Sequence, residues 1–303
     1  MLRKLLRYVK DEDYRFLIHC DRAKKFTSMP DEDFLKRKFK ASMGKPLNLE
    51  HPTTFNEKLQ WIKLYDRKPI YTVMADKHLV KDYVSQKLGP QYIIPTLGVW
   101  DDPEDIDFDR LPSRFVLKCN HNSGLGMYIC QDQSQMDKKA VIKGLKKGLQ
   151  EDYYLSSREW PYKDIPRKII AEAYMEDASG GLIDYKVHCF GGEPKFILVC
   201  GDRFSGKGLT EDFVTTQWER MDVKRPGIKL SHQLMEKPAQ LEEILELSRK
   251  LSADIPFVRT DFYIINHKVY FSEMTFFPAA GFRPFEPESW DETFGSWISL
   301  PAK

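Results

Sequence analysis

Residues 115–130, FVLKCNHNSGLGMYIC, form the stretch that decides the fold. Apolar side chains alternate with others over its first five residues, which is typical of a strand, and strand character resumes over its last three. The loop between them carries Gly124 and Gly126, and glycine lets a backbone approach an anion closely with several N–H groups. Lys118 stands at the entrance of the loop as a point charge for a phosphate. The stretch therefore indicates a nucleotide-phosphate clamp, whereas a tight hairpin turn is the simpler interpretation of the glycine pair alone.

The chain has 303 residues, with 47 Lys or Arg against 45 Asp or Glu and a formal net charge of +2. This balance disfavours a general nucleic-acid-binding protein, because such proteins concentrate basic residues on one surface. Hydrophobic residues make up 42% and charged residues 30%, as in an ordinary globular enzyme. No apolar run approaches the roughly 18 residues that a membrane-spanning helix needs, and the N-terminus lacks the apolar core of a signal peptide. We therefore expect a cytoplasmic protein.

The five cysteines are scattered, and none forms a Cys-x-x-Cys pair. We expect reduced, mostly buried thiols rather than a zinc site. They are Cys20, Cys119, Cys130, Cys189 and Cys200. His188 lies in an apolar strand pattern, which favours a packed, hydrogen-bonded core residue over a catalytic one.

The first 50 residues are dense in charge. Leu2, Leu5, Leu6 and Val9 recur at helical spacing, which predicts an amphipathic helix packed on the main body. A foothold on an anionic membrane surface is the alternative. Acidic residues interrupt the basic ones from Asp11 onward, and this favours packing over membrane contact.

Helical and strand patterns follow along the rest of the chain. Helices are predicted at residues 55–66, 74–87, 137–150 and 238–252. Thr54 and Glu57 form a capping-box pattern for the first helix. Strands are predicted at 92–97, 115–119, 128–130 and 168–174, with hairpins over 184–200 and 258–277 and a mobile loop over 203–227. The order indicates an α+β protein with predominantly antiparallel strands and a nucleotide cleft between two subdomains.

The last hairpin holds the most informative polar residues. Asp261 and Glu273 fall close to opposite each other if the hairpin turns at residues 266–267, and facing carboxylates repel unless a cation lies between them. Mg²⁺ suits such a pair, because it prefers one or two carboxylates together with phosphate oxygens. Arg259 points to the same face by the strand period. Surface ion pairs are the alternative interpretation, and the joint presence of the glycine loop favours a site.

Eight motifs follow one another along residues 50–300. They are FNEKLQW at 55–61, ADKHLVKDYV at 75–84, FVLKCNHNSG at 115–124, IIAEAYMED at 169–177, DYKVHCFGG at 184–192, DR at 202–203, RTDFYI at 259–264 and SEMTFFPAAG at 272–281. The ordered series resembles the ATP-grasp superfamily, most closely its teichuronopeptide-biosynthesis-type (TupA-like) branch from bacterial surface-polysaccharide gene clusters. The series is specific as an order, although each motif alone is not.

The resemblance implies an ATP-grasp fold, with largely antiparallel sheets and a nucleotide cleft between two α/β subdomains. It also implies a division of the chain into four parts. These are an N-terminal helical extension at 1–50, a substrate-side subdomain at 51–112, a small subdomain with the glycine loop at 113–175 and a catalytic subdomain at 176–303.

The same resemblance implies roles for individual residues. The nucleotide phosphates are expected to bind Lys77, Lys118 and the loop at Ser123, Gly124 and Gly126. The adenine hinge is expected from Glu172 and the backbone of Ala173 and Tyr174, and the ribose-side acid from Asp184, with Glu176 and Asp177 as competitors. Lys186 and Arg203 are expected to neutralise the transferring phosphate, Arg259 to stabilise the acyl-phosphate or tetrahedral intermediate, and Asp261 and Glu273 to bind Mg²⁺.

Two positions near the end of the series need comment. Many ATP-grasp ligases have asparagine two residues after the second metal carboxylate, where this chain has Thr275. A threonine hydroxyl can still bind the metal or its water, although more weakly. Arg283 lies just beyond Gly281, where it can hold a substrate carboxylate or be a surface cation.

The resemblance implies an ATP-dependent carboxylate–amine ligase that forms an amide through an acyl-phosphate, with ATP and Mg²⁺ as cofactors. The expected partners are a uronic-acid sugar or glycan of a capsule or cell surface and an amino acid or small amine, with no nucleic acid. A glycosyltransferase or ATP-dependent sugar kinase of the same pathway and a non-catalytic ATP-binding protein are the alternatives. Lys118, Arg259, Asp261 and Glu273 occur together, which disfavours the last of these. Peripheral membrane association stays open.

Overall fold

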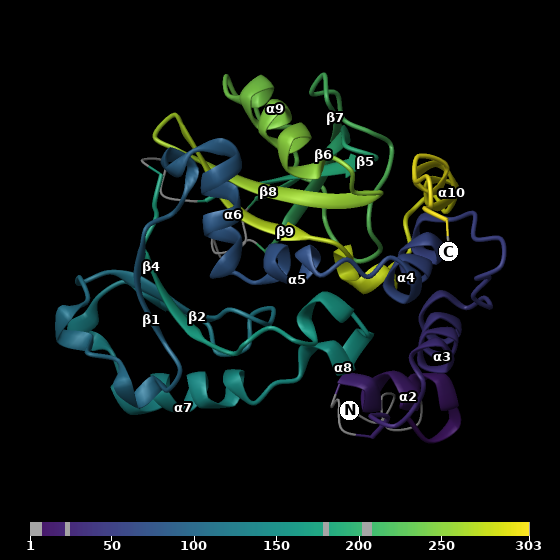
Figure 1. The fold of residues 1–303 in the computed structure, drawn as a ribbon. Coiled ribbons are helices and arrows are strands. Elements are labelled where there is room, and N and C mark those ends of the chain that lie inside the picture. The colour runs from purple at the N-terminus through teal and green to yellow at the C-terminus, as the bar shows by residue number, and fades with distance from the viewer. Residues whose placement is uncertain (1–7, 22–24, 178–181, 202–207, 303) are drawn as a thin grey trace.

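The computed structural model describes residues 8–21, 25–177, 182–201 and 208–302. Its described strands form two antiparallel sheets, which lie in the lower and upper lobes of Figure 1. The small sheet has the order β1-β4-β2-β3 and the large sheet the order β7-β6-β5-β8-β9. The expected α+β class with antiparallel strands is therefore confirmed.

The strands have the following bounds. The small sheet contains β1 (Thr96–Trp100), β2 (Phe115–Cys119), β3 (Tyr128–Cys130) and β4 (Ile169–Ala173). The large sheet contains β5 (Asp184–Phe190), β6 (Glu193–Gly201), β7 (Thr210–Thr215), β8 (Phe257–Ile265) and β9 (Lys268–Thr275). Because β1 precedes residue 112 and β2 follows it, the small sheet draws on both sides of the expected boundary there, and the division into domains stays a prediction.

The α-helices are α2 (Glu12–Asp21), α3 (Asp31–Met43), α4 (Phe55–Tyr65), α5 (Ile70–Ala75), α6 (Leu79–Leu88), α7 (Lys138–Leu149), α8 (Tyr153–Ser157), α9 (Leu241–Ser252) and α10 (Ser289–Ser296). Short 3₁₀ helices cover Pro90–Tyr92, Pro103–Asp105, Phe108–Arg110, Gln133–Gln135, Trp160–Tyr162 and Pro278–Gly281. The predicted capping box of α4 is present, with the Thr54 hydroxyl and the Glu57 carboxylate each accepting from the other's backbone N–H.

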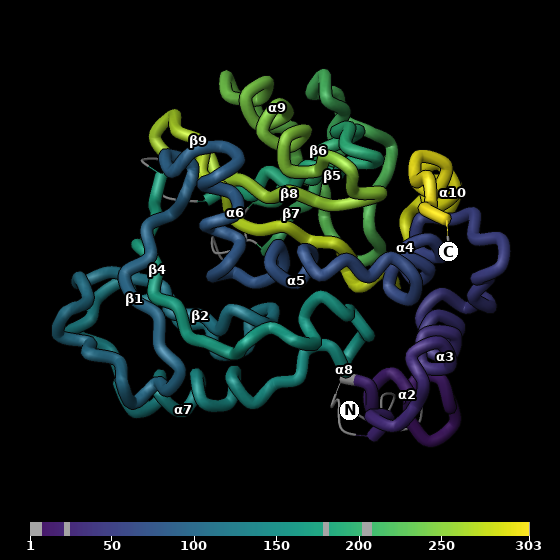
Figure 2. Tube along the Cα trace, viewed as in Figure 1, coloured from purple at the N-terminus to yellow at the C-terminus, as the bar shows by residue number. Residues whose placement is uncertain are grey.

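Each sheet has one face covered by a helix. In the small sheet, Phe115 and Leu117 are fully buried in one cluster with Leu145 of α7, so Lys118 points to the opposite face. In the large sheet, Thr260 of β8 donates its hydroxyl to Ser248 of α9 at 2.9 Å. Residues 259 and 261 therefore lie on the face of the large sheet away from α9. Helix α5 packs along β9 on the side of the large sheet toward the small sheet (Figure 2).

The helix predicted at residues 74–87 is wrong, because the chain breaks there into α5 and α6. Asp76 has the extended ψ of 115°. Its Oδ1 accepts from the backbone N–H of His78 at 2.8 Å and from the amide of Asn120 at 2.9 Å. A carboxylate that bonds the backbone two residues on favours a turn over a continuous helix. Lys77 therefore lies in the break rather than on a helix face.

Two further predictions need correction. The strand expected at 92–97 begins at Thr96, after the 3₁₀ helix Pro90–Tyr92. The mobile loop expected at 203–227 contains β7, whose charged residues Glu211 and Asp212 hide the strand pattern, although both are buried. Predictions that fall on residues 1–7 and 202–207 lie outside the described residues.

The N-terminal helices α2 and α3 pack through apolar side chains. Phe16, Phe34 and Phe39 are buried, and their helices lie beside α8 (Figure 1).

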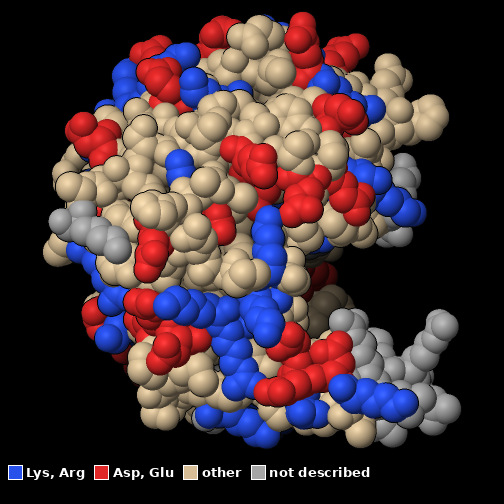
Figure 3. Space-filling view, turned by 90° about the vertical axis from the view of Figure 1, so that its right-hand side faces the viewer, with Lys and Arg blue, Asp and Glu red and all other residues tan. Residues whose placement is uncertain are grey.

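On the face of the molecule drawn in Figure 3, acidic groups interrupt the basic side chains. No helix among the described residues is long and apolar enough to span a membrane. All five cysteines are buried, as expected.

Candidate nucleotide and catalytic site

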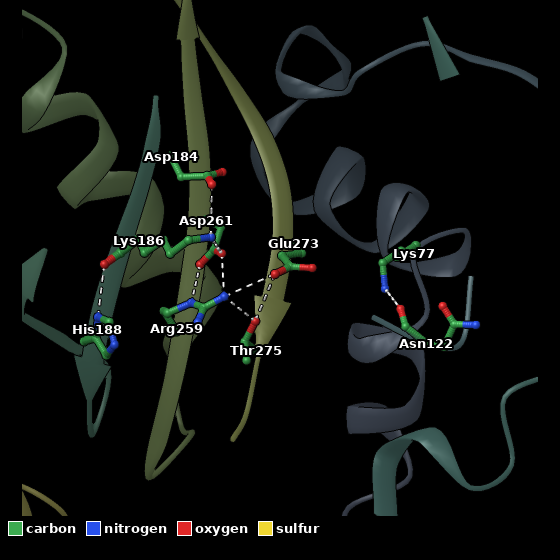
Figure 4. Close-up of polar contacts among 9 residues, drawn as sticks. All are labelled: Lys77, Asn122, Asp184, Lys186, His188, Arg259, Asp261, Glu273 and Thr275. Atoms are coloured by element: carbon green, nitrogen blue, oxygen red, sulfur yellow. Dashed lines mark hydrogen bonds and ion pairs between the residues drawn. The ribbon is translucent and has the colours of Figure 1, made fainter. Parts of the chain in front are cut away.

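Asp261 lies at the centre of an ionic cluster on β8 (Figure 4). Its side chain is fully buried. Arg259 donates from Nε to Asp261 Oδ1 at 2.7 Å and from Nη2 to Oδ2 at 2.6 Å, and Lys186 of β5 donates from Nζ to Oδ2 at 2.6 Å. Lys186 and Asp261 are directly paired across β5 and β8, so their side chains share one face. This face carries two of the three predicted catalytic cations, Arg259 and Lys186, together with one of the predicted metal carboxylates, Asp261.

Glu273 and Thr275 join the same cluster from β9. The register pairs Asp261 with Glu273 and Arg259 with Thr275, as the hairpin pattern predicts. Arg259 Nη2 donates to Glu273 Oε1 at 3.1 Å and to Thr275 Oγ1 at 2.9 Å. The cation between the two facing carboxylates is therefore a guanidinium. Mg²⁺ binding would have to exchange with some of these contacts.

The charges in this cluster stabilise one another. Burial alone would raise the pKa of Asp261, but Arg259 and Lys186 outweigh it and hold that pKa below its usual value. Burial lowers the pKa of Lys186, whereas Asp261 more than offsets this and raises it. The pKa of Arg259 is raised for the same reason, by Asp261 against the effect of burial. All three groups are thus charged at neutral pH.

A second ionic cluster lies on the small sheet. Glu172 of β4 is buried between two lysines, with Lys81 Nζ 2.6 Å from Oε1 and Lys118 Nζ 2.6 Å from Oε2. The two lysines outweigh the effect of burial and hold the pKa of Glu172 below its usual value. Lys81 also donates to Ile94 O and Thr96 Oγ1, both at 2.9 Å. Lys118 bonds to Glu172 alone within the described chain, so Lys118 is the lysine with donors left for a phosphate.

Lys77 connects the two clusters. Its Nζ donates to the carbonyl of Asn122 at 2.5 Å, and Figure 4 shows it on the side of β9 toward which Glu273 points. Burial lowers the pKa of Lys77, the carboxylate of Glu273 raises it and the ammonium of Lys118 lowers it further. Lys77 therefore lies within electrostatic reach of the small-sheet cluster and of the large-sheet cluster. That these groups share one site stays a prediction.

The glycine loop is hydrogen-bonded to the segment between α5 and α6 and to helix α7. Asn120 bonds to Asp76, and Asn122 Nδ2 donates to Gly148 O of α7 at 3.1 Å. Gly126 has a φ of +76°, and a Cβ there would lie 3.0 Å from the Cα of Gly148. Close packing against α7 thus already accounts for this glycine. Gly124 has a φ of +88° with open space around it, as a loop that approaches a ligand needs.

Some groups of the predicted adenine hinge already make contacts within the chain. The side chain of Glu172 is held by lysines, and the Ala173 N–H donates to Pro95 O at 3.0 Å. The ring of Tyr174 lies under the guanidinium of Arg114, whose carbon is 4.0 Å from the ring centre. An adenine at this edge would therefore meet the carbonyl of Ala173 or the backbone beyond it.

Three acids were candidates for the ribose side. Glu176 is paired at 2.6 Å with Arg114 on the surface, and Asp177 accepts from the backbone of Asn266 at 2.9 Å. Asp184 is buried on the catalytic face, with its Oδ2 3.6 Å from Lys186. Of the three, Asp184 lies nearest the catalytic cluster.

The remaining predicted residues are distributed as follows. Arg203 lies outside the described residues. Arg283 donates from Nη2 to Pro226 O at 3.1 Å, and Ser123 is a hydrogen-bond partner of Tyr153. His188 is buried, its Nδ1 donates to Lys186 O at 3.0 Å, and its ring stacks on Phe196, so the core assignment is confirmed. Sequence reasoning missed Lys81, although its motif was recognised.

The donor set fits Mg²⁺. Asp261, Glu273 and Thr275 offer only oxygen, and Mg²⁺ is commonly held by one or two carboxylates plus substrate phosphates rather than by an all-protein cage. The described residues contain no group of three or more His, Cys, Asp or Glu side chains that could hold a metal ion. Glu273 is 37% exposed, whereas Asp261 is enclosed, so Glu273 is the more accessible ligand.

Comparison with known proteins gave the following matches. The family model described as TupA-like ATPgrasp matches residues 57–299. Among solved structures, D-alanine–D-alanine ligase from Bacillus anthracis is 15% identical with a TM-score of 0.42, over 67% of this chain and 57% of that one. The same enzyme from Helicobacter pylori is 17% identical with a TM-score of 0.42, over 81% and 69%. A RimK domain ATP-grasp protein from Sphaerobacter thermophilus is 10% identical with a TM-score of 0.41, over 75% and 69%.

The chain spans little more than half the length of the Bacillus anthracis ligase. The comparison with curated proteins gave no match.

Proposed function

The chain belongs to the TupA-like ATP-grasp family, and from this premise we propose that it is a ligase that uses ATP to join a carboxylate to an amine. The fold class expected from the sequence is that of this family. ATP-grasp enzymes use ATP with Mg²⁺, so these are its cofactors.

One observation carries the proposal. Arg259, Asp261 and Glu273 share the face of the large sheet that is not covered by α9, and Lys77 lies within electrostatic reach of Glu273 and of Lys118. These observations support a common region bounded by basic groups of one lobe and acidic groups of the other. A polyphosphate with a divalent cation needs this combination, because its oxygens bind ammonium groups and its metal binds carboxylates.

The proposed reaction has two steps. A carboxylate oxygen bonds to the γ-phosphorus of ATP, the bond to the β-phosphate bridging oxygen breaks, and ADP leaves. The amine nitrogen then bonds to the carbonyl carbon of the acyl-phosphate, and inorganic phosphate leaves. A free carboxylate is a poor acceptor for an amine at neutral pH, and the first step supplies the leaving group.

The chain's own residues have distinct tasks in this scheme. Lys77 and Lys118 hold phosphate oxygens, and Lys186 lies where it can neutralise the transferring phosphoryl group. Arg259 stabilises the negative charge that develops on the acyl oxygen. Asp261, Glu273 and Thr275 would hold Mg²⁺, which when bound would neutralise charge on the phosphates.

The substrates in this proposal are a uronic-acid sugar or glycan of a capsule or cell-surface polysaccharide and an amino acid or small amine. Resemblance to the polysaccharide-linked branch of the superfamily supports this assignment, and fold alone would not. A glycosyltransferase or sugar kinase of the same pathway is the alternative.

An assay separates these functions. The protein is incubated with Mg²⁺, ATP, a uronic-acid glycan or sugar nucleotide and a panel of amines, and ADP, phosphate and the acceptor mass are followed. A ligase gives ADP and phosphate in equal amounts with one new amide. A product that retains phosphate indicates a kinase, and cleavage of the sugar nucleotide without ATP use indicates a glycosyltransferase.

Matched lysine variants provide a control for this assay. Lys186→Met removes an ammonium from the catalytic face of β5 and should abolish most ADP formation. Lys195→Met removes one from an exposed position of the adjacent β6 and should leave it unchanged. Equal activity of the two variants would contradict the assignment of the site.

A further inference from the structure

The catalytic face of the large sheet extends beyond the residues assigned so far. Asp184 of β5 pairs with Cys200 of β6, and Cys200 pairs with Glu211 of β7. Directly paired residues point to the same side of a sheet, so Glu211 shares the face of Asp184. Two strand spacings separate them, roughly 10 Å. An acidic side chain therefore stands on this face beyond the proposed nucleotide ligands.

Arg225 begins a turn that leads back to this part of the face, since Ile228 N–H donates to Arg225 O at 3.2 Å and Glu211 N–H donates to Lys229 O at 3.0 Å. Its neighbour Lys224 forms a two-way backbone bridge with Glu286, which fixes the segment beside the chain that follows β9. The side chain is 8% exposed. No hydrogen bond or ion pair of its guanidinium is found within the described chain, and its Nε is buried without a partner. A buried arginine in this condition requires an explanation, because arginine carries five donors.

Glu211 has the complementary defect. It is 7% exposed, and its Oε2 is buried without a hydrogen-bond partner. The next residue, Asp212, points to the opposite face, where Arg220 Nη2 forms an ion pair with its Oδ1 at 3.0 Å, although that oxygen likewise has no hydrogen-bond partner within the described chain. No ion pair joins Glu211 to Arg225 within the described chain.

The charges around Arg225 show what lies near it. Burial lowers the pKa of Arg225, Glu211 raises it, and Arg259 and Arg283 lower it. Arg283 is held beside it through the hydrogen bond to Pro226 O, the carbonyl of the residue after Arg225. One carboxylate, that of Glu211, and two other guanidinium groups, those of Arg259 and Arg283, thus act on Arg225 electrostatically. An unpaired buried donor and an unpaired buried acceptor in one place cost stability unless a ligand satisfies both.

We propose that Arg225 and Glu211 bind a zwitterionic α-amino acid, with its carboxylate on Arg225 and its ammonium on Glu211, and that this amino acid is the amine substrate. The assignment rests on the proposed ligase function and specifies one of its two substrates. Arg283 adds positive charge on the carboxylate side, and Glu211 places the nitrogen on the face that carries Lys186 and Arg259.

The reaction balances with this substrate. The nitrogen–carbon bond forms as the bond between the acyl carbon and the phosphate oxygen breaks, and that oxygen leaves with the electron pair. The nitrogen loses two protons on going from ammonium to amide. One ends on the departing phosphate and the other in the solvent.

Calorimetry on the full chain tests the proposal without knowledge of the carboxylate substrate. The protein with Mg²⁺ and a non-hydrolysable ATP analogue is titrated with each of the common L-amino acids, with the matching decarboxylated amines and with the matching acids that lack the amino group. At least one amino acid should bind about tenfold or more tightly than either of its truncated forms, because each loses one charge-assisted hydrogen-bonding group. Equal binding of an amino acid and its decarboxylated amine, or no binding of any amino acid, overturns the proposal.

Variants locate the site. Arg225→Gln and Glu211→Gln should each weaken binding of the preferred amino acid about tenfold or more, whereas Lys224→Gln, which alters an exposed surface ion pair next to Arg225, should bind as the wild type. Unchanged binding in both Arg225→Gln and Glu211→Gln overturns the assignment. If either variant fails to fold, the comparison of amino acid with truncated analogues on the wild type still decides.

A second assay separates failure of this proposal from failure of the ligase function. Hydroxylamine attacks an acyl-phosphate without needing an amino-acid site, so Mg²⁺, ATP and a uronic acid should yield ADP and a hydroxamate. Hydroxamate formation without amino-acid preference overturns the amino-acid site and leaves the ligase function standing. Absence of hydroxamate with every uronic acid, together with absence of amino-acid binding, overturns both.

Discussion

The two sheets each carry a buried carboxylate held between two cations, and they hold it differently. On the small sheet, Glu172 is bound by two lysines whose side chains are 12% and 20% exposed. On the large sheet, Asp261 is fully enclosed and is bound by two nitrogens of one arginine, Nε and Nη2 of Arg259, and by a lysine. The pKa of each carboxylate is lowered by its partners.

The difference suggests a division of labour. An ammonium is a point charge that can exchange a carboxylate for a phosphate, and Lys118 has no further bond among the described residues to hold it back. The planar fork of Arg259 is fixed by three side chains and keeps a defined direction. The small sheet therefore suits binding of a mobile polyphosphate. The large sheet suits a transition state, where placement matters most.

The largest contrast is expected in stability. Asp261→Asn leaves Arg259 and Lys186 buried without a counter-charge and should lower the free energy of unfolding by about 3–5 kcal/mol. Glu172→Gln leaves two lysines that can reach water and should cost about 1–3 kcal/mol. Urea unfolding of both variants measures the difference. An equal or larger loss in Glu172→Gln would break the comparison.

Catalysis should depend on the rigid cluster. Arg259→Ala is expected to lower kcat by about 10²–10³, since it removes one preorganised donor to developing charge. Nucleotide binding should persist, because Lys77 and Lys118 remain. Steady-state kinetics and calorimetry with Mg²⁺ and ATP measure the two quantities, with Arg249→Ala in an exposed ion pair as the control. Wild-type turnover in Arg259→Ala would exclude its assigned role.

A third buried carboxylate, that of Glu159, sharpens the comparison, because no ion pair to it is found among the described residues. Burial raises the pKa of Glu159 to about 7, against the effects of Lys63 and Lys38. A carboxylate with a raised pKa binds its proton more tightly in the folded state, so stability falls as the pH rises from about 4.5 to about 7. The difference in unfolding free energy between the wild type and Glu159→Gln should change by roughly 3 kcal/mol over this range. A pH-independent difference would contradict the raised pKa.

The two lysines around Glu172 should differ in nucleotide binding. Lys118→Ala is expected to weaken Mg·ATP binding about tenfold, since it removes one charge-assisted phosphate contact. Lys81 is held by a carboxylate, a carbonyl and a hydroxyl, so Lys81→Ala should change the Kd less than Lys118→Ala does. Calorimetric titration gives both Kd values. The reverse order would assign the phosphate contact to Lys81.

Local patterns predicted much of this molecule. The period of two, the turn at residues 266–267 and the positive φ values of Asn266 and His267 explain why the pairing of Asp261 with Glu273 follows from sequence. The break at residue 76 did not follow from the helical spacing. The local bond from His78 N–H to Asp76 favours a turn, but the bond from Asn120 that also holds Asp76 joins segments 44 residues apart. Spacing along the chain carries no information on such contacts.

The site shows the same limit. Lys118, Arg259 and Asp261 stand on strands whose alternation fixes their faces. The sequence pattern did not identify Glu211 and Arg225. The charged residues of β7 obscure its strand pattern, and Arg225 lies in a segment that is neither helix nor strand. Their burial becomes visible only once the neighbouring strands are in place.

The central claim is that one magnesium–nucleotide complex binds to both clusters at once. Calorimetric titration of a non-hydrolysable ATP analogue, with and without Mg²⁺, tests it on Lys118→Ala and Glu273→Gln. Loss of the lysine should weaken binding in both conditions, whereas loss of the carboxylate should weaken it only when Mg²⁺ is present. If Glu273→Gln binds the magnesium complex as the wild type does, or if neither variant changes the Kd, the two clusters do not share the ligand.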